Sequence, residues 1–136
     1  MREDSFNYNL ARFLGNPVDT AVPRTFVFED LNFQTGSARL TPESTRTVTD
    51  LVAILKAYPT AKAHLDGHTD NTGDAAANKQ LSLDRAKSVR DMMVANGIDA
   101  ARLDYAGFGQ EHPLAPNDTE DGRARNRRTE LVVLAK

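Results

Sequence analysis

The chain contains no cysteine, which excludes disulfide bonds and zinc sites built on thiolates. Charge of one sign is also not in excess, because 17 Lys and Arg residues stand against 19 Asp and Glu residues, for a formal net charge of −2. A general electrostatic attraction to nucleic acid is therefore absent. Any charged ligand must be recognised through the local placement of charge.

Long apolar runs are missing as well. None approaches the ~20 residues that a membrane-spanning helix needs, and the opening residues MREDSFNYNL do not form a signal peptide. Internal repeats and low-complexity tracts are absent too. What is present is a chain of 136 residues, 40% hydrophobic and 26% charged, which is enough for one domain with a real core.

The apolar pattern predicts four strands and two main helices. The β-prone segments are 25–33, 61–70, 103–109 and 128–135. One helix is predicted to open at Thr41-Pro42 and to bury an i, i+3, i+4, i+7 stripe that starts at Val48; the other runs from about residue 78 to 96 and ends at Gly97. A short helix is also expected near EDGRARNRR, residues 120–128.

This order of elements predicts an α/β fold, a two-layer β-α-β-α-β-β sandwich in which a mixed four-stranded sheet carries its helices on one face. Residues 25–136 would form this domain. Residues 1–24, with scattered apolar side chains and two prolines, are expected to be an N-terminal arm or linker that contains a short helix.

The segment HLDGHTDNTGD, residues 64–74, raises the question of a metal site or a catalytic pair. Strict alternation over 61–70 places small residues on one side of the strand and polar ones, His64 to Asp70, on the other, which we expect to be solvated. His64 and His68 would lie about 14 Å apart, too far to share one ion, and His112 falls in a distant loop. We therefore expect neither a metal nor a cofactor.

Catalytic and nucleic-acid sites lack support for similar reasons. Asp66 and Asp70 are expected to point into solvent, and no serine lies in a nucleophile-elbow pattern. Four arginines lie between residues 123 and 128, but acidic residues precede them and no aromatic residue is interleaved. We expect neither an enzyme nor a nucleic-acid-binding protein.

Asp70 and Arg85 remain as a candidate pair. The turn NTGDAAA brings the end of the second strand to the start of the second helix, and Arg85 shares the inward side of that helix. A carboxylate and a guanidinium held there suit a zwitterion, with the acid on an ammonium and the arginine on a carboxylate. From the residues alone, the two groups could equally well pair with each other.

Four blocks in order, GHTDNTG, NKQLSLDRAKSV, GIDAARLDYAGFGQEHP and GRARNRRTEL, resemble the OmpA-like C-terminal domain that is shared with Pal-type lipoproteins and MotB-type stator proteins. The likeness covers roughly residues 26–135. It implies non-covalent peptidoglycan binding in the periplasm of a diderm bacterium. It also implies that Asp70 and Arg85 hold the diaminopimelate of the stem peptide, while Asn78 lines the same pocket and caps the helix.

Other matches to the family are less specific. The resemblance implies that Arg127 or Arg128 approaches the ligand's carboxylates while the other supports the fold. Gln34 departs from the acid that many members carry. Further candidate ligand-binding residues are Thr69, Asn71, Thr72 and Phe33.

The sequence thus predicts a non-enzymatic module that anchors an envelope or membrane partner to the cell wall. The membrane tether would lie in a segment outside this sequence. A protein-interaction module or a homodimer is the competing interpretation, which Gln34 favours and the intact Asp70, Asn78 and Arg85 disfavour. An enzyme that acts on the wall would need a nucleophile or metal constellation that the sequence does not offer.

Overall fold

The structure, a computed structural model, describes residues 6–28, 32–34 and 36–136. Its elements in chain order are α1 (Phe6–Gly15), β1 (Arg24–Val27), α2 (Pro42–Ala57), β2 (Lys62–His68), α3 (Ala75–Ala95), a 3-10 turn (Ala100–Arg102), β3 (Leu103–Gly109), α4 (Glu120–Asn126) and β4 (Arg128–Ala135). No described helix is both long enough and apolar enough to span a bilayer.

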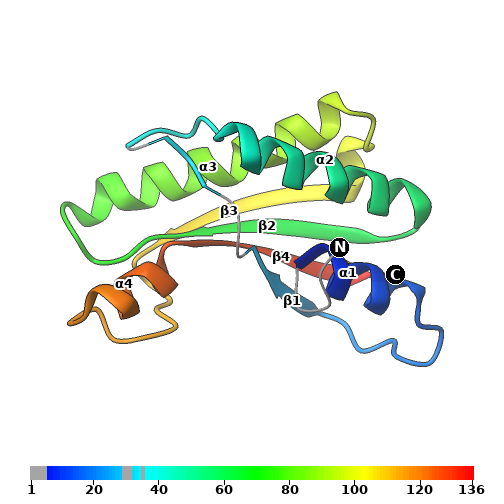
Figure 1. The fold of residues 1–136 in the computed structure, drawn as a ribbon, viewed down its shortest axis with the longest axis horizontal. Coiled ribbons are helices and arrows are strands. Elements are labelled where there is room, and N and C mark those ends of the chain that lie inside the picture. Colours follow the sequence, from blue (N-terminus) through cyan, green and yellow to red (C-terminus); the bar gives the residue numbers. More distant parts are fainter. Residues whose placement is uncertain (1–5, 29–31, 35) are drawn as a thin grey trace.

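The four strands form one mixed sheet in the order β1-β4-β2-β3. β2 and β3 run parallel, whereas β4 is antiparallel to both of its neighbours. Helices α2 and α3 lie next to each other on the same face of this sheet (Figure 1). The predicted α/β architecture is therefore confirmed.

The core lies between the two helices and the sheet. Fully buried side chains come from every layer, among them Leu51, Leu65, Val89 and Leu131. Helix α1 contributes Leu10, Phe13 and Leu14 to the same cluster. The N-terminal helix is thus docked on the domain, while the predicted boundary between residues 24 and 25 stays a prediction.

Two glycines bring α3 close to the sheet. A Cβ atom on Gly67 would lie 2.1 Å from the Ser82 carbonyl oxygen, and one on Gly107 would lie 2.3 Å from the Leu83 nitrogen. Both obstacles are helix backbone, which cannot move aside cheaply. Helix α3 therefore packs against the face of β2 that carries the small residues of the alternating pattern.

Two predicted boundaries were wrong. β1 ends at Val27, and Phe33 lies beyond it in an isolated bridge with Leu40, while residues 29–31 of the predicted strand lie outside the described part of the chain. Helix α3 begins at Ala75, because Asp74 in the preceding turn is its N-cap and accepts a hydrogen bond from the Ala77 amide at 2.8 Å. Asn78 therefore lies inside the helix and does not cap it.

The polar side of β2 is not solvated at its C-terminal end, which also contradicts the expectation. Asp66, His68 and Asp70 are only 6–7% exposed. Phe108 at the end of β3 stacks on the His68 ring with centroids 5.4 Å apart, and His112 in the segment after β3 places its ring 6.1 Å from that of His68. His112, predicted to be distant, is therefore a close neighbour of His68.

Candidate functional site

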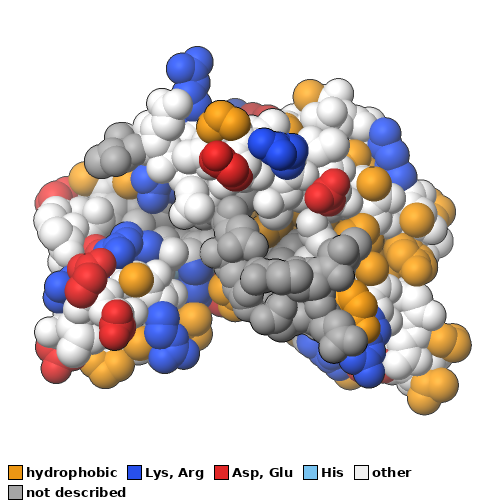
Figure 2. Space-filling view, viewed as in Figure 1, with side chains coloured by type: hydrophobic (Ala, Val, Ile, Leu, Met, Phe, Trp, Pro, Cys, Tyr) orange, Lys and Arg blue, Asp and Glu red, His pale blue; other side chains and the backbone are white. Residues whose placement is uncertain are grey.

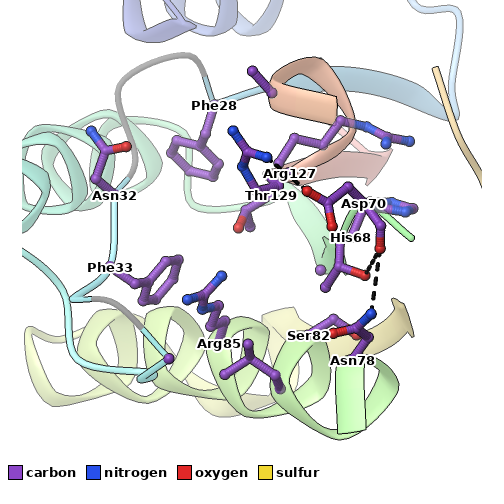
Figure 3. A pocket seen from close by; sticks show the side chains of 16 residues that line it. Phe28, Asn32, Phe33, His68, Asp70, Asn78, Ser82, Arg85, Arg127 and Thr129 are labelled. Atoms are coloured by element: carbon purple, nitrogen blue, oxygen red, sulfur yellow. Dashed lines mark hydrogen bonds and ion pairs between the residues drawn. The ribbon is translucent and has the colours of Figure 1, made fainter. Parts of the chain in front are cut away.

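A cavity of about 540 Å³ opens where β2 ends and α3 begins. Its other walls come from the segment after β1, from α4 and from the start of β4 (Figure 3). Seven of the nine predicted site residues line it, namely Phe33, Thr69, Asp70, Asn78, Arg85, Arg127 and Arg128. Asn71 and Thr72 are exposed and fall outside the described lining, as does Gln34.

Asp70 follows β2 and presents a carboxylate to the cavity while being 7% exposed. Its Oδ1 accepts a hydrogen bond from the Thr72 amide at 2.9 Å, and its Oδ2 pairs with Arg127 Nη1 at 2.7 Å. Burial raises the pKa of this carboxyl, but the Thr72 amide and the Arg127 guanidinium outweigh burial, and the pKa lies below its ordinary value. Asp70 is therefore an anion at neutral pH.

Arg85 projects from α3 on a separate wall of the cavity (Figure 3). Its Nε donates to the Ser37 carbonyl oxygen at 2.9 Å, and its guanidinium lies over the Phe33 ring, 4.9 Å from the centroid. Burial lowers the pKa of this half-buried group, and no carboxylate of the described residues forms an ion pair with it. In the described part of the chain, Asp70 and Arg85 thus do not neutralise each other.

Arg127 is the cation that Asp70 does hold. Its Nη2 also pairs with Glu120 Oε1 at 2.7 Å, so Arg127 bridges the end of β2 and the start of α4. Glu120 and Asp70 both raise the pKa of Arg127, whose side chain is 43% exposed.

Arg128 differs from Arg127 in that its side chain is only 6% exposed. Its Nε pairs with Glu130 Oε2 at 2.9 Å, and its Nη2 donates to the His112 carbonyl oxygen at 3.0 Å. This arginine ties the segment after β3 to β4. Its neighbour Arg127 is the more accessible of the two.

Asn78 and Thr69 shape the backbone around Asp70. Asn78 Nδ2 donates to the carbonyl oxygens of Thr72 at 2.9 Å and Asp70 at 3.5 Å, while the buried Thr69 hydroxyl donates to the Asp70 carbonyl oxygen at 2.8 Å. These bonds fix the turn that carries the carboxylate (Figure 3).

Asn126 is a site-forming residue that sequence reasoning missed. It is fully buried at the end of α4, immediately before Arg127. Its Oδ1 accepts from the Leu114 and Ala115 amides at 2.7 and 3.0 Å, and its Nδ2 donates to the Ala115 carbonyl oxygen and to Asn117 Oδ1, both at 2.9 Å. Its place in the block GRARNRRTEL was the only available signal.

Ser82 was also assigned no role from the sequence. Its buried hydroxyl donates to the Lys79 carbonyl oxygen at 2.8 Å and accepts from the Gly109 amide at 2.9 Å. This bond holds α3 to the end of β3 beside the cavity. Ser82 is thus a structural residue, in keeping with its lack of a nucleophile pattern.

The surface around α4 is of mixed charge. Lys and Arg side chains lie next to Asp and Glu side chains there (Figure 2), and Arg123 pairs with Glu120 at 3.2 Å. A continuous basic surface of the kind that binds a nucleic-acid backbone does not form on this face. The cavity itself is lined by three arginines and Asp70.

Comparison with known proteins places this geometry in a family. Residues 32–127 match the OmpA family. The probable lipoprotein YiaD of Escherichia coli is 38% identical over 76% of this chain and 48% of its own length. The peptidoglycan-binding protein ArfA of Mycobacterium tuberculosis is 41% identical over 74% of this chain and 31% of its own length.

Among solved structures, the cell wall anchor of the T6SS from Pseudomonas aeruginosa is similar with a TM-score of 0.73 and 31% identity, over 93% of this chain and 97% of that one. This chain spans less than half the length of the two curated relatives above. The matched residues include β2, the Asp70 that follows it and the helix α3 that carries Arg85. The chain belongs to the OmpA family.

Proposed function

We propose that this domain binds peptidoglycan non-covalently in the cell envelope and, without catalysing a reaction, anchors a membrane-tethered partner to the wall. The stem-peptide diaminopimelate would occupy the cavity. Membership of the OmpA family supports this proposal, as do the relative named as peptidoglycan-binding and the similar structure described as a cell wall anchor. One observation carries the ligand assignment. An ionised Asp70 and an Arg85 without a carboxylate partner among the described residues line separate walls of one cavity.

The side-chain end of diaminopimelate carries an ammonium and a carboxylate on one carbon. Asp70 would accept the ammonium, and the Nη groups of Arg85 would donate to the carboxylate. Stacking on Phe33 and the bond from Nε to Ser37 hold the guanidinium in a fixed plane, so little side-chain freedom is lost when the ligand binds.

A single site of this kind binds weakly in isolation. Tethering to a membrane and a polymeric target raise the effective concentration, so a weak site is sufficient for anchoring. The proposed function therefore requires selectivity for the wall peptide more than high intrinsic affinity.

Calorimetric titration tests the proposal. The ligand is a stem peptide that contains diaminopimelate, and the matched control peptide carries lysine, which has the ammonium and lacks the carboxylate. The wild type should prefer the diaminopimelate peptide at least about tenfold, because one charge-assisted contact contributes roughly 1.5–3 kcal/mol. The variants Asp70→Asn and Arg85→Gln should lose binding while keeping their circular dichroism.

The matched protein control is Asp50→Asn, an exposed change on α2 away from the cavity, which should bind as the wild type does. Equal affinity of the wild type for both peptides would refute the clamp. The absence of any binding by folded wild type would redirect the function to protein–protein interaction.

A further inference from the structure

A polar cluster on the sheet face that α2 and α3 leave uncovered adjoins the peptide cavity, whose lining includes its member His68. Asp66 on β2 is directly opposite Glu130 on β4, and His68 follows two residues later on the same side of β2. The ligand atoms that these three side chains offer all lie within 4.8 Å of one another. Asp66 and His68 are buried, and the Glu130 side chain is 13% exposed.

Two of the three ion-pair partners of these carboxylates in the described part of the chain are histidines. Within the described part of the chain, their ion-pair partners are His64 on Asp66, at 2.7 Å, and His68 and Arg128 on Glu130, at 3.2 and 2.9 Å. Only Arg128 is charged at every pH near neutrality.

His68 supplies an independent sign of a missing partner. Its side chain is 3% exposed, and neither ring nitrogen makes a hydrogen bond with the described residues. Nε2 nevertheless lies 3.2 Å from Glu130 Oε1, without hydrogen-bond alignment. Two ligand atoms of a tetrahedral zinc ion lie roughly 3.4 Å apart, because each is ~2.1 Å from the metal. This pair already has the spacing of two ligands of one ion.

We propose that Asp66, His68 and Glu130 bind a divalent transition-metal ion of the zinc type, with His112 as the fourth ligand. The His112 ring lies 6.1 Å from the His68 ring on an exposed segment, which would have to move for His112 to reach the ion. Arg128 occupies Oε2 of Glu130, so Glu130 binds the metal through Oε1 alone. A set of imidazole and carboxylate ligands favours Zn²⁺ over Mg²⁺ or Ca²⁺.

The test is a titration of Zn²⁺ into the chelator-stripped chain, followed by calorimetry and by thermal unfolding. The wild type should bind one ion and show a rise in Tm that EDTA reverses. His68→Gln should weaken binding at least about 100-fold and His112→Gln about tenfold. The control Asp70→Asn, which removes the carboxylate of the peptide pocket, should bind Zn²⁺ as the wild type does. Loss of peptide binding and loss of metal binding are thereby distinguished.

A readout on the wild type does not depend on the folding of any variant. Co²⁺ in place of Zn²⁺ should give the intense visible bands of a tetrahedral site, and Mg²⁺ should not compete. No Zn²⁺ binding at millimolar metal, or undiminished binding by His68→Gln, would overturn the proposal.

Discussion

Single side chains decide the chemistry of both polar sites. The Asp70 carboxylate accepts a hydrogen bond from the Thr72 amide through one oxygen and forms an ion pair with the Arg127 guanidinium through the other. At Glu130, the same division gives one oxygen to Arg128 and the other to His68. Each acid thus has one partner close in sequence, Thr72 for Asp70 and Arg128 for Glu130, and one that is distant in sequence, Arg127 for Asp70 and His68 for Glu130.

Ligand binding at Asp70 should depend on pH and on salt concentration. The pKa of this carboxyl lies below its ordinary value of 3.8, so the anion persists from neutral pH to about that value. Affinity for the wall peptide should therefore be flat between about pH 7 and pH 4.5 and should fall in more acidic solution. Raising NaCl from about 50 to about 500 mM should weaken binding, because the pocket is partly open. Calorimetry across both series checks this, and binding that is indifferent to both would contradict the clamp.

Glu130 should make the fold sensitive to acid. Burial raises the pKa of Glu130, but the adjacent His68 ring and the Arg128 guanidinium outweigh burial and lower the pKa to about 2, against 4.5 in the unfolded chain. Because the folded pKa is the lower one, its contribution to stability is complete above about pH 4.5 and is lost as the pH falls toward 2.

We therefore expect Glu130→Gln to flatten the fall in unfolding free energy between these pH values by roughly 1–2 kcal/mol, after allowance for solvent screening. Urea denaturation at several pH values measures this slope. Glu43→Gln, an exposed change on α2, is the control and should leave it unaltered. Parallel slopes for Glu130→Gln and the wild type would contradict the role of Glu130.

Sequence reasoning found the two ends of the proposed clamp and missed what holds them. Asp70 and Arg85 were predictable because strand alternation, helix spacing and the family blocks all converge on them. The pairing of Asp70 with Arg127 spans 57 residues, and nothing local to either residue encodes it. The burial of Asp66 and His68 was missed for the same reason, since the covering residues Phe108 and His112 belong to a different segment.

At the scale of elements, strong periodicity was predictable and irregular ends were not. The interiors of α2, α3 and the last three strands follow their apolar patterns. The end of β1 depends on turn geometry. The start of α3 depends on Asp74 acting as the N-cap, and several polar residues in NTGD could have taken that position. The close approach of α3 to the sheet, however, can be tested directly.

Gly67→Ala should cost about 1–3 kcal/mol of unfolding free energy, because the new methyl group would collide with the Ser82 carbonyl in the helix backbone. Gly15→Ala is the matched control. There the obstacle is the Tyr58 hydroxyl at 2.7 Å, the end of a side chain that can rotate away. Chemical denaturation of both variants compares them. Equal losses of unfolding free energy in the two variants would show that the α3 backbone moves aside as readily as a side chain does.

Asn126→Ala should detach the segment between β3 and α4. The change removes hydrogen bonds to Leu114, Ala115 and Asn117, four in all and made by a fully buried side chain, at a cost of about 2–4 kcal/mol. Affinity for the wall peptide should fall with it, because Arg127 follows directly. Asn96→Ala, which removes one exposed bond at the end of α3, should cost less than about 1 kcal/mol. A stability loss at Asn126 no larger than at Asn96 would contradict this anchoring role.

The molecule as a whole places its N-terminal helix in the same core as the sheet. Because Leu10 on α1 is fully buried, Leu10→Ala should cost about 2–5 kcal/mol. The urea transition should stay single, with an unchanged m-value, since one cooperative unit unfolds. Arg12→Ala on the exposed side of the same helix is the control and should change stability by less than about 0.5 kcal/mol. A separate early transition in the wild type would instead identify α1 as an independent arm.

Arg127 pairs with both Asp70 and Glu120, so its guanidinium already holds the position at Asp70 that the ammonium of the proposed ligand would take. Under the proposed function, an incoming ammonium would displace this guanidinium from Asp70, so recognition would be an exchange of partners with a small net gain. The displaced Arg127 would still be held by Glu120 and could meet a carboxylate of the ligand. When the ligand dissociated, the guanidinium would return to Asp70, and the proposed attachment to the wall would therefore be readily reversible.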